Sequence, residues 1–320
     1  MSASTILNSN GFNQHTDGLE VASRFKDLIV GKTVLITGAG EGGLGAEAAF
    51  SIASASPALL ILHGRAEERV KPVVERITAA FPSVKTRIFL MDLDSLASVR
   101  KAAAEVASWE DVAIDVLINN AAVMAAPYST TKDGFESQFG VGHLGHFLFT
   151  CLLLKANKIK SGGRIVNVSS GGHRLGPVRF DDPGFTNGTK YEKWAAYGQV
   201  KTANMLFSIA LAERLKDRNI LSFSLHPGGI HTNLLRHLSQ EDLENLIKSL
   251  REREPDYEFK TLQQGVSTHL VAAFDPSIAK HNGAYLSDCQ IAQPLRPDAG
   301  DPEEARKLWT LSEELVGEKF

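Results

Sequence analysis

Short apolar segments alternate with longer segments of helical character along most of this 320-residue chain. The apolar segments lack a polar face, as parallel strands do when helices cover both sides of their sheet. They comprise residues 33–37, 59–63, 86–91, 116–119, 164–169, 221–226 and 284–286. Segments of helical length lie between them, for example residues 46–55, 65–80, 95–107 and 195–217. This alternation predicts an α/β fold, a doubly wound parallel seven-stranded sheet with helices on both faces.

The organisation of the chain follows from the same pattern. Hydrophobic residues make up 43% of the chain, which is enough for one large α/β core or two small ones, and we expect a single domain. Residues 1–25 are expected to form a loosely held arm and residues 26–320 the domain. The charged segment 232–260 interrupts the alternation and is expected to form a lid over the site. A closing helix should begin at Pro302, with Trp309 as its apolar anchor.

Charge and composition exclude several classes of function. The formal net charge of -3 gives no electrostatic reason to expect nucleic acid or a membrane surface as a partner. The longest apolar stretches are too short to span a bilayer, and residues 1–20 carry no signal-peptide pattern. Cys151 and Cys289 have neither metal-type spacing nor a disulfide framework. We therefore expect a soluble, cytoplasmic protein that holds no metal.

A glycine-rich turn lies between the first expected strand and the helix that follows it. Residues 37–45 read TGAGEGGLG, and Gly38, Gly40 and Gly43 fit the dinucleotide fingerprint G-x-G-x-x-G. Nearly bare backbone can approach a pyrophosphate, and a helix that begins near Leu44 directs its free N–H groups at the phosphate charge. The position of the turn, rather than the glycines alone, indicates a nucleotide site.

The end of the second expected strand bears on the choice of cofactor. NAD-selective sites usually carry Asp or Glu there, whereas this chain reads His63-Gly64-Arg65. An arginine beside the ribose attracts a 2′-phosphate, so we expect NADP(H). The alternative is that Arg65 merely opens a solvated helix together with Glu67 and Glu68.

Tyr197 and Lys201 are four residues apart in a helical segment and should therefore share one helix face. An ammonium near a phenol lowers the phenol pKa, and such a tyrosine can exchange a proton with a carbonyl oxygen. Ser170, at the end of the fifth expected strand, could hold the same oxygen. A Tyr–Lys pair at this spacing is usually plain helix surface, but here the serine and the glycine turn converge on the same sheet edge.

On these residues the chain resembles the short-chain dehydrogenase/reductase family, and most of all its retinol-dehydrogenase-like branch. The matching segments are Asp92-Leu93, Asn119-Asn120-Ala121-Ala122, Ser169-Ser170, Tyr197-x-x-x-Lys201 and residues 226–232. The resemblance implies a Rossmann-type dinucleotide-binding fold and an oxidoreductase that interconverts a carbonyl and an alcohol on a largely apolar small molecule. Members of the family often pair through the two long helices nearest Gly142 and Tyr197, so the resemblance allows a homodimer, although the sequence does not fix the oligomeric state.

The resemblance also implies roles for individual residues. Tyr197 would be the acid and base, Lys201 would lower its pKa and hold the nicotinamide ribose, and Ser170 would steady the substrate carbonyl. Further residues would line the cofactor, namely Leu44, Asp92, Leu93, Asn119, Ile230 and Thr232.

The chain departs from the family pattern at two positions. The glycine turn from Gly38 to Gly43 is one residue longer than usual, which leaves open which N–H meets which phosphate. In the helix segment 139–147, Gly142 stands where the family has an asparagine that helps to hold a proton-relaying water. Glycine keeps the backbone carbonyl but offers no amide, and glycines at 140, 142 and 145 should each weaken this helix by about 1 kcal/mol.

Three functions therefore remain under consideration. The first is an NADP(H)-linked oxidoreductase with a degraded relay. The second, suggested by Gly142, is a non-redox enzyme such as a dehydratase, isomerase or cyclase on the same scaffold, and the third is a cofactor sensor without catalysis. The pair His143 and His146 lacks a third metal ligand and is interpreted as packing. His231 and His237 are interpreted as loop histidines, and Tyr191 and Trp194 belong either to a substrate wall or to the core.

Overall fold

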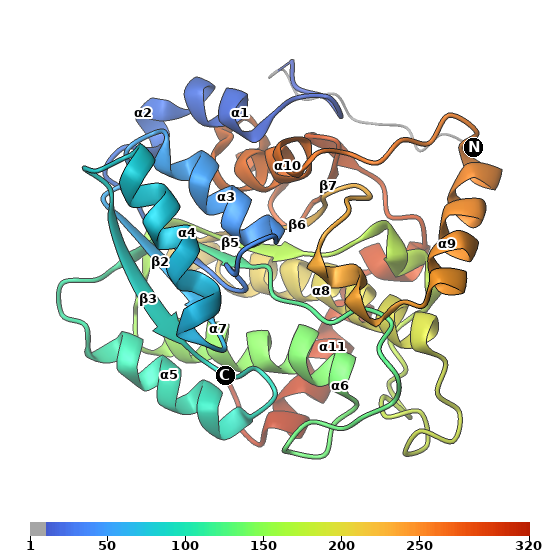
Figure 1. The fold of residues 1–320 in the computed structure, drawn as a ribbon. Helices are drawn as coiled ribbons and strands as arrows, with labels where there is room; N and C mark the ends of the chain where they lie inside the picture. Colours follow the sequence, from blue (N-terminus) through green and yellow to red (C-terminus); the bar gives the residue numbers. More distant parts are fainter. Residues whose placement is uncertain (1–10) are drawn as a thin grey trace.

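The computed structural model describes residues 11–320 and contains an eight-stranded sheet between two layers of helices (Figure 1). The strands lie in the order β3-β2-β1-β4-β5-β6-β7-β8, and every neighbouring pair is parallel except β7 with β8. Their bounds are β1 Thr33–Ile36, β2 Leu59–Gly64, β3 Lys85–Leu90, β4 Ile114–Asn119, β5 Ile159–Val168, β6 Leu221–His226, β7 Tyr285–Ser287 and β8 Gln290–Ala292. The chain reverses its direction of travel across the sheet between β1 and β4. Ligands bind outside the carboxyl ends of the strands at such a switch point.

The doubly wound fold is confirmed, but the expected count of seven strands is wrong. The eighth strand, β8, returns antiparallel to β7 after a two-residue turn in which Asp288 and Cys289 both have positive φ, 52° and 64°. Turns of this geometry normally carry Asn-Gly or Asp-Gly. A three-residue strand behind an Asp-Cys turn gives the sequence pattern nothing to detect.

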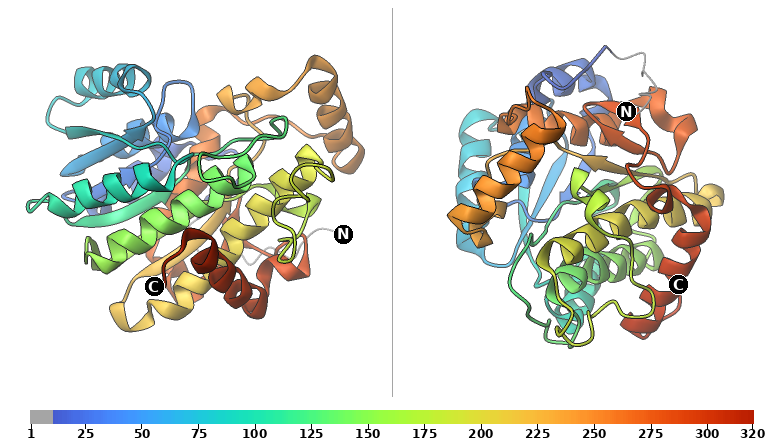
Figure 2. Two further views of the ribbon diagram at one scale, coloured as in Figure 1. Left: turned by 90° about the horizontal axis from the view of Figure 1, so that it is seen from below. Right: turned by 90° about the vertical axis from the view of Figure 1, so that its right-hand side faces the viewer.

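The helices form one layer on each face of the sheet (Figures 1 and 2). One layer contains α1 (Gly18–Arg24), α3 (Leu44–Ala53), α4 (Glu67–Ala80) and α10 (Leu262–Phe274), which share one apolar core with the sheet. The other contains α5 (Leu96–Ser108), α7 (Gly145–Lys155), α8 (Lys193–Arg214) and α11 (Pro302–Val316), which share a second core. The short helices α2 (Lys26–Ile29) and α6 (Ser137–Phe139) join these elements. The four helical segments predicted from the sequence correspond to α3, α4, α5 and α8.

The N-terminal segment packs more firmly than expected. Phe12, Val21 and Ala22 are buried, and α1 lies against α3 and α10. Most residues of this segment are polar, so its few buried apolar side chains do not stand out in the sequence. The expectation of a loose arm is therefore wrong for residues 11–25. Residues 1–10, the rest of that arm, lie outside the described residues.

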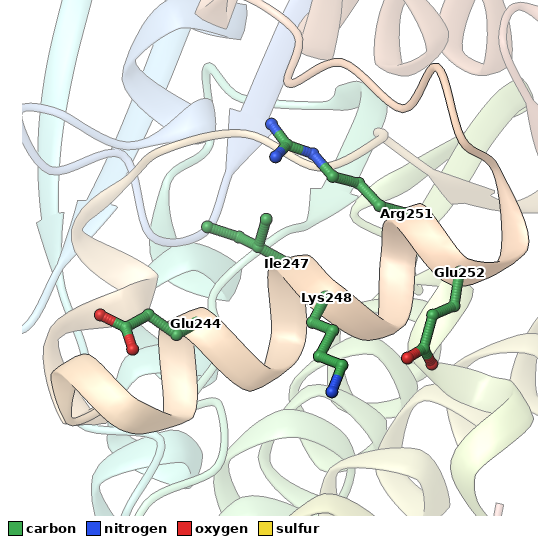
Figure 3. Close-up of a pocket in the computed structure, with 5 residues that line it drawn as sticks. All are labelled: Glu244, Ile247, Lys248, Arg251 and Glu252. Atoms are coloured by element: carbon green, nitrogen blue, oxygen red, sulfur yellow. The ribbon is translucent and has the colours of Figure 1, made fainter.

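The segment after β6 projects from the body of the molecule. It contains a 3₁₀ turn, η4 (Asn233–His237), and α9 (Gln240–Arg253), which has no buried residue. A capping box between Ser239 and Asp242 begins α9, and Asp242 also forms an ion pair with Lys193 of α8 at 2.5 Å. Figure 2 shows α9 standing off from the sheet, and Figure 3 shows a shallow hollow along it that is lined by α9 residues alone.

The closing helix is confirmed, with Trp309 buried as its anchor. Trp309 contacts Phe147 of α7 edge-to-face at 5.1 Å, and the Ser312 hydroxyl lies 2.7 Å from Nε2 of His143. Helix α11 therefore covers α7 and α8, the two helices through which a homodimer was expected to pair. The chain itself thus covers part of the face on which that pairing was expected.

Candidate active site

The sequence-predicted site residues gather at the carboxyl edge of the sheet, at the ends of β1, β4, β5 and β6. The glycine turn follows β1, Asn119 ends β4, Ser170 follows β5 and His226 ends β6. This edge is also where η4 and the first turn of α8 lie. No helix within residues 11–320 is both long enough and apolar enough to cross a membrane.

The glycine turn has the shape of a phosphate cradle. Gly38 adopts φ +68° against Ala121, and a Cβ on Gly45 would lie 2.5 Å from the Gly38 carbonyl oxygen, so both positions require glycine. Helix α3 begins at Leu44 without a side-chain cap, which leaves its N–H groups free for an anion. The residues present therefore fit a dinucleotide pyrophosphate. A Cβ on Gly40 would make only an ordinary contact of 3.6 Å, so the strict requirement falls on Gly38 and Gly45, and the fingerprint reading had not included Gly45.

A buried histidine supports this turn from below. His63 Nδ1 accepts a hydrogen bond from the Gly38 N–H at 3.1 Å, so its Nε2–H donates to the Met91 carbonyl at 2.8 Å. Burial lowers the pKa of His63 to about 4, which keeps the ring neutral and fixes the proton on Nε2. His63 thereby joins the glycine turn to the end of β3. Sequence reasoning missed this role, because a histidine in an apolar strand gives no sign of what lies above it.

Two neighbouring asparagines at the end of β4 have different hydrogen-bond partners. The Asn119 amide donates to Thr150 Oγ1 at 3.0 Å and to Asn167 Oδ1 at 2.9 Å, so its side chain is engaged below the sheet edge. The Asn120 amide instead donates to the Thr37 carbonyl at 2.8 Å and braces the glycine turn. The Asn119 amide nitrogen is therefore not available to a cofactor, whereas its Oδ1 is buried without a hydrogen-bond partner among the described residues.

The expected adenosine side of the site is built around Arg65 and Asp92. Arg65 is exposed directly after β2, and Asp92 forms an ion pair of 2.7 Å with Lys132. Burial acts to raise the pKa of Asp92, but hydrogen bonds from Lys132 and from the Asp94 backbone outweigh it and hold the pKa below its usual value. Leu93 is buried, with its side chain against Gly145 of α7.

Tyr197 and Ser170 face each other at the end of β5. The Ser170 hydroxyl is hydrogen-bonded to the phenol and also accepts the Gly172 N–H at 3.0 Å. A Cβ on Gly172 would lie 2.6 Å from the Tyr197 ring, so a glycine two residues after the serine is what allows this approach. Both oxygens can therefore reach one substrate oxygen.

Lys201 lies on the same face of α8 as Tyr197, as the spacing predicts. Its ammonium is buried 5.6 Å from the centre of the tyrosine ring and donates to the Val168 carbonyl at 2.9 Å. Burial lowers the pKa of Lys201 to about 8.

The expected lowering of the tyrosine pKa is absent from this arrangement. Burial raises the pKa of Tyr197 to about 12, although the Ser170 hydrogen bond and the Arg174 charge act in the opposite direction. The physical reason is that the lysine amine bonds a backbone carbonyl rather than the phenol, so desolvation dominates. Arg174, four residues beyond Ser170, was not anticipated as a neighbour of the site.

The helix segment with three glycines contains one π-turn, η1 (Gly140–Leu144), which continues into α7. A Cβ on Gly142 would lie 2.6 Å from Cγ1 of Val200, and Cβ atoms on Gly140 and Gly145 would collide with Thr131 and Leu93. The glycines thus permit close packing where the sequence suggested only weakness. The space of the family's asparagine side chain is filled by Val200, the residue before Lys201.

The residues expected after β6 have structural partners of their own. Ile230 pairs with Lys260 in an isolated bridge and packs on Gly265 of α10. Thr232 caps η4, its hydroxyl accepting the Leu234 N–H at 3.2 Å. The next residue, Asn233, connects this segment to the glycine turn, because its amide donates to the Glu41 carbonyl at 3.0 Å.

An apolar wall adjoins the tyrosine. Met124, Ala125 and Tyr197 form a buried cluster against which further apolar residues pack, namely Trp194, Leu234, Leu235 and Leu238. A hollow of about 410 Å³ opens beside this wall and is lined by residues that include Tyr128, Tyr191 and His237. Trp194 thus belongs to a wall next to the reacting groups, while the Tyr191 hydroxyl is tied to the Ala126 carbonyl at 2.8 Å.

The discounted histidines have packing roles. His143 is bonded to Ser312, and His146 Nε2 lies 2.9 Å from the Thr37 hydroxyl; burial lowers the pKa of each to about 3. His231 stacks on Phe259 at 4.2 Å. Within residues 11–320 no group of three potential ligands could hold a metal ion.

Comparison with known proteins places these features in context. Residues 32–181 match a family model described as short chain dehydrogenase. Human retinol dehydrogenase 14 is 39% identical to this chain over 302 residues, which cover 91% of this chain and 88% of that protein. The short-chain dehydrogenase/reductase prx1 of Penicillium rubens is 35% identical over 305 residues, covering 91% of this chain and 86% of that protein.

Solved structures share the fold. An uncharacterised protein from Mycobacterium Paratuberculosis superposes with a TM-score of 0.68 at 31% identity, over 91% of this chain and 96% of its own. A short chain dehydrogenase from Burkholderia cenocepacia, solved in complex with NADP, has a TM-score of 0.63 at 21% identity, over 82% of this chain and 97% of its own. At that identity the second likeness shows the fold alone.

Proposed function

The chain belongs to the short-chain dehydrogenase/reductase family and is an oxidoreductase of alcohols or carbonyls, and we propose that it uses NADP(H) with Tyr197 as its acid and base. The observation that carries the proposal is the meeting of three side chains at the sheet edge. Gly172 lets the Tyr197 ring approach Ser170, and the Lys201 ammonium is buried 5.6 Å from the centre of that ring. Beside them lies a glycine cradle that fits a pyrophosphate. A nicotinamide, when bound, supplies hydride transfer; the chain supplies the proton and the positioning.

Each reacting side chain has a distinct task. Tyr197, with a pKa raised to about 12 by burial, is protonated at neutral pH and can donate to a carbonyl oxygen. The Ser170 hydroxyl holds that oxygen from the strand side. Lys201 places its buried ammonium 5.6 Å from the centre of the ring, and we propose that it holds the nicotinamide ribose.

Arg65 supports NADP(H) over NAD(H). It is exposed at the end of β2, where NAD-selective sites carry a carboxylate, and its charge is available to a 2′-phosphate. The residues proposed to line the rest of the cofactor are Gly38, Gly40, Gly43, Leu44, Asp92, Leu93, Asn119, Ile230 and Thr232.

The substrate is proposed to be a largely apolar small molecule. The wall formed by Met124, Trp194 and the leucines of η4 lies directly beside Tyr197. Residues 232–260 contribute to this wall, which supports their proposed role as a lid within a domain that spans residues 26–320. Figure 3 shows Ile247 and Arg251 pointing from one side of α9, and Lys248 and Glu252 from the other. We also propose a cytoplasmic location, which the low cysteine content of the chain, two in 320 residues, favours.

The test follows NADPH absorbance against a panel of apolar ketones and aldehydes. Tyr197→Phe should lower turnover by about 10²- to 10⁴-fold, while its affinity for NADP⁺ stays within about twofold of the wild type. Tyr285→Phe, which removes a buried hydroxyl from β7, is the control and should keep its activity. Full turnover in Tyr197→Phe would show that the acid is another group.

A second candidate function rests on Gly142. An enzyme without the family's asparagine could retain the cofactor and run a dehydration, isomerisation or cyclisation. Product formation without any change in the oxidation state of the cofactor would favour this candidate.

A further inference from the structure

Three arginines from separate elements converge beside the glycine turn. Arg65 follows β2, Arg69 lies in the first turn of α4, and Arg236 lies in η4, after β6. The side chains of all three are largely exposed. Partial burial lowers the pKa of Arg236, and the positive charges of Arg65 and Arg69 lower it further. Like charges gathered in this way repel one another unless an anion lies between them.

The backbone contacts explain why the arginines meet. The Glu41 N–H, at the tip of the glycine turn, donates to the Arg69 carbonyl at 3.0 Å. On the other side, the Asn233 amide donates to the Glu41 carbonyl at 3.0 Å. Glu41 is thus held between α4 and η4, and it lies in the stretch from Gly38 to Gly43 that is one residue longer than the family pattern. In Figure 1 the start of the segment between β6 and α9 lies beside the loop that leads from β1 to α3.

The side chain of Arg236 is braced in this position. Its Nη1 donates to the Asn233 carbonyl at 3.0 Å, which leaves the other guanidinium nitrogens available to a ligand. In the described part of the chain, none of the three arginines forms an ion pair with a carboxylate. The charge of Arg65 acts to lower the pKa of both Asp92 and Asp94, but Asp92 is already engaged by Lys132.

From this arrangement we infer that Arg236 is a cofactor-specificity residue, which binds the 2′-phosphate of NADP(H) from the lid side and thereby fixes the lid segment over the site. This inference rests on the proposed use of NADP(H). Arg65 and Arg69 supply the fixed side of the phosphate site, and Arg236 supplies the side that belongs to residues 232–260. Because η4 also carries Leu234 and Leu235 of the apolar wall, binding of the 2′-phosphate orders the substrate wall as well.

The first arm of the experiment measures binding of NADP⁺ and NAD⁺ by titration calorimetry with the full chain. Arg236→Ala should weaken NADP⁺ binding by about 10- to 100-fold, the worth of a charge-assisted hydrogen bond, and leave NAD⁺ within about twofold. Arg251→Ala removes an exposed arginine of α9 from the same segment and should change neither affinity. Arg236→Lys should recover part of the loss.

The second arm measures hydrogen exchange of residues 233–253 with each cofactor at saturation. NADP⁺ should protect this segment more than NAD⁺ does in the wild type, and the difference should vanish in Arg236→Ala. Equal loss of both affinities would assign Arg236 to the pyrophosphate and overturn the inference, and so would unchanged binding of NADP⁺. A wild type that binds the two cofactors equally would instead overturn the proposed use of NADP(H).

Discussion

Val200 occupies the space that a side chain at position 142 would need, with its Cγ1 2.6 Å from the point where a Cβ on Gly142 would lie. The two residues come from different helical elements, η1 and α8, and Val200 directly precedes Lys201. The replacement of the family's asparagine by glycine therefore leaves no empty space beside the lysine. It is one half of a packed contact whose other half belongs to the Tyr-x-x-x-Lys motif.

This contact predicts that Gly142→Asn destabilises the fold. The new side chain must displace Val200, which is fully buried, and overpacking of this kind costs about 1–3 kcal/mol. Urea unfolding of the wild type and the variant gives the change in free energy directly. An unchanged midpoint would mean that Val200 moves aside freely.

A double-mutant cycle separates the clash from other effects of the substitution. Val200→Ala should cost about 2 kcal/mol alone because it removes buried carbon. The double variant Gly142→Asn/Val200→Ala should lose less unfolding free energy than the two single variants lose together, by about 1 kcal/mol or more. The same double variant is the fair test of whether an asparagine raises turnover, since the single variant changes packing beside Lys201.

The sequence predicted seven of the eight strands of the sheet and the meeting of Ser170, Tyr197 and Lys201, because strand periodicity and motif spacing are local properties. It could not predict the state of these groups. The Lys201 amine donates to the Val168 carbonyl of β5 rather than to the phenol, so it does not lower the pKa of Tyr197. Residue spacing within α8 does not reveal this acceptor, because it belongs to another element. His63 was missed for the same reason, since its partners, Gly38 and Met91, lie 25 and 28 residues away in the chain.

His63 is predicted to set the shape of the glycine turn. His63→Leu leaves the Gly38 N–H and the Met91 carbonyl without their partner, at a cost of about 1–3 kcal/mol in stability for each group that stays buried. The affinity for NADP⁺ should fall by about tenfold, because the first N–H group of the cradle is no longer oriented. Calorimetric titration and thermal unfolding measure the two effects. His63→Gln, which can donate and accept, should recover part of both, and unchanged affinity in the leucine variant would contradict the role.

Helix α11 predicts the oligomeric state. Because Trp309 packs on Phe147 of α7 and Ser312 is bonded to His143 of η1, α11 covers part of the face that α7 and α8 would offer to a second copy, and light scattering should find no dimer paired through that face. Trp309→Ala should cost about 3–5 kcal/mol, as for other buried tryptophans, and cause self-association through the uncovered face. A dimer in the wild type that dissociates on substitution of exposed α7 or α8 residues would contradict this reading of the surface.

Lys201 is predicted to serve function at the expense of stability. Its amine is charged below pH 8 although it is buried, and one hydrogen bond to the Val168 carbonyl does not replace its hydration, so the charged form destabilises the fold. Lys201→Met should therefore raise the melting temperature at pH 7 while turnover is lost.

The sign of the pH dependence follows from the pKa values of Lys201, about 8 in the folded chain and 10.5 as the ordinary value. Between them the unfolded chain binds more protons, so wild-type stability rises with pH across this window. The advantage of the methionine variant should thus be largest below pH 8 and shrink toward pH 10, and an advantage that is absent at pH 7, or that grows with pH, would mean that the ammonium has partners enough to be stable where it lies.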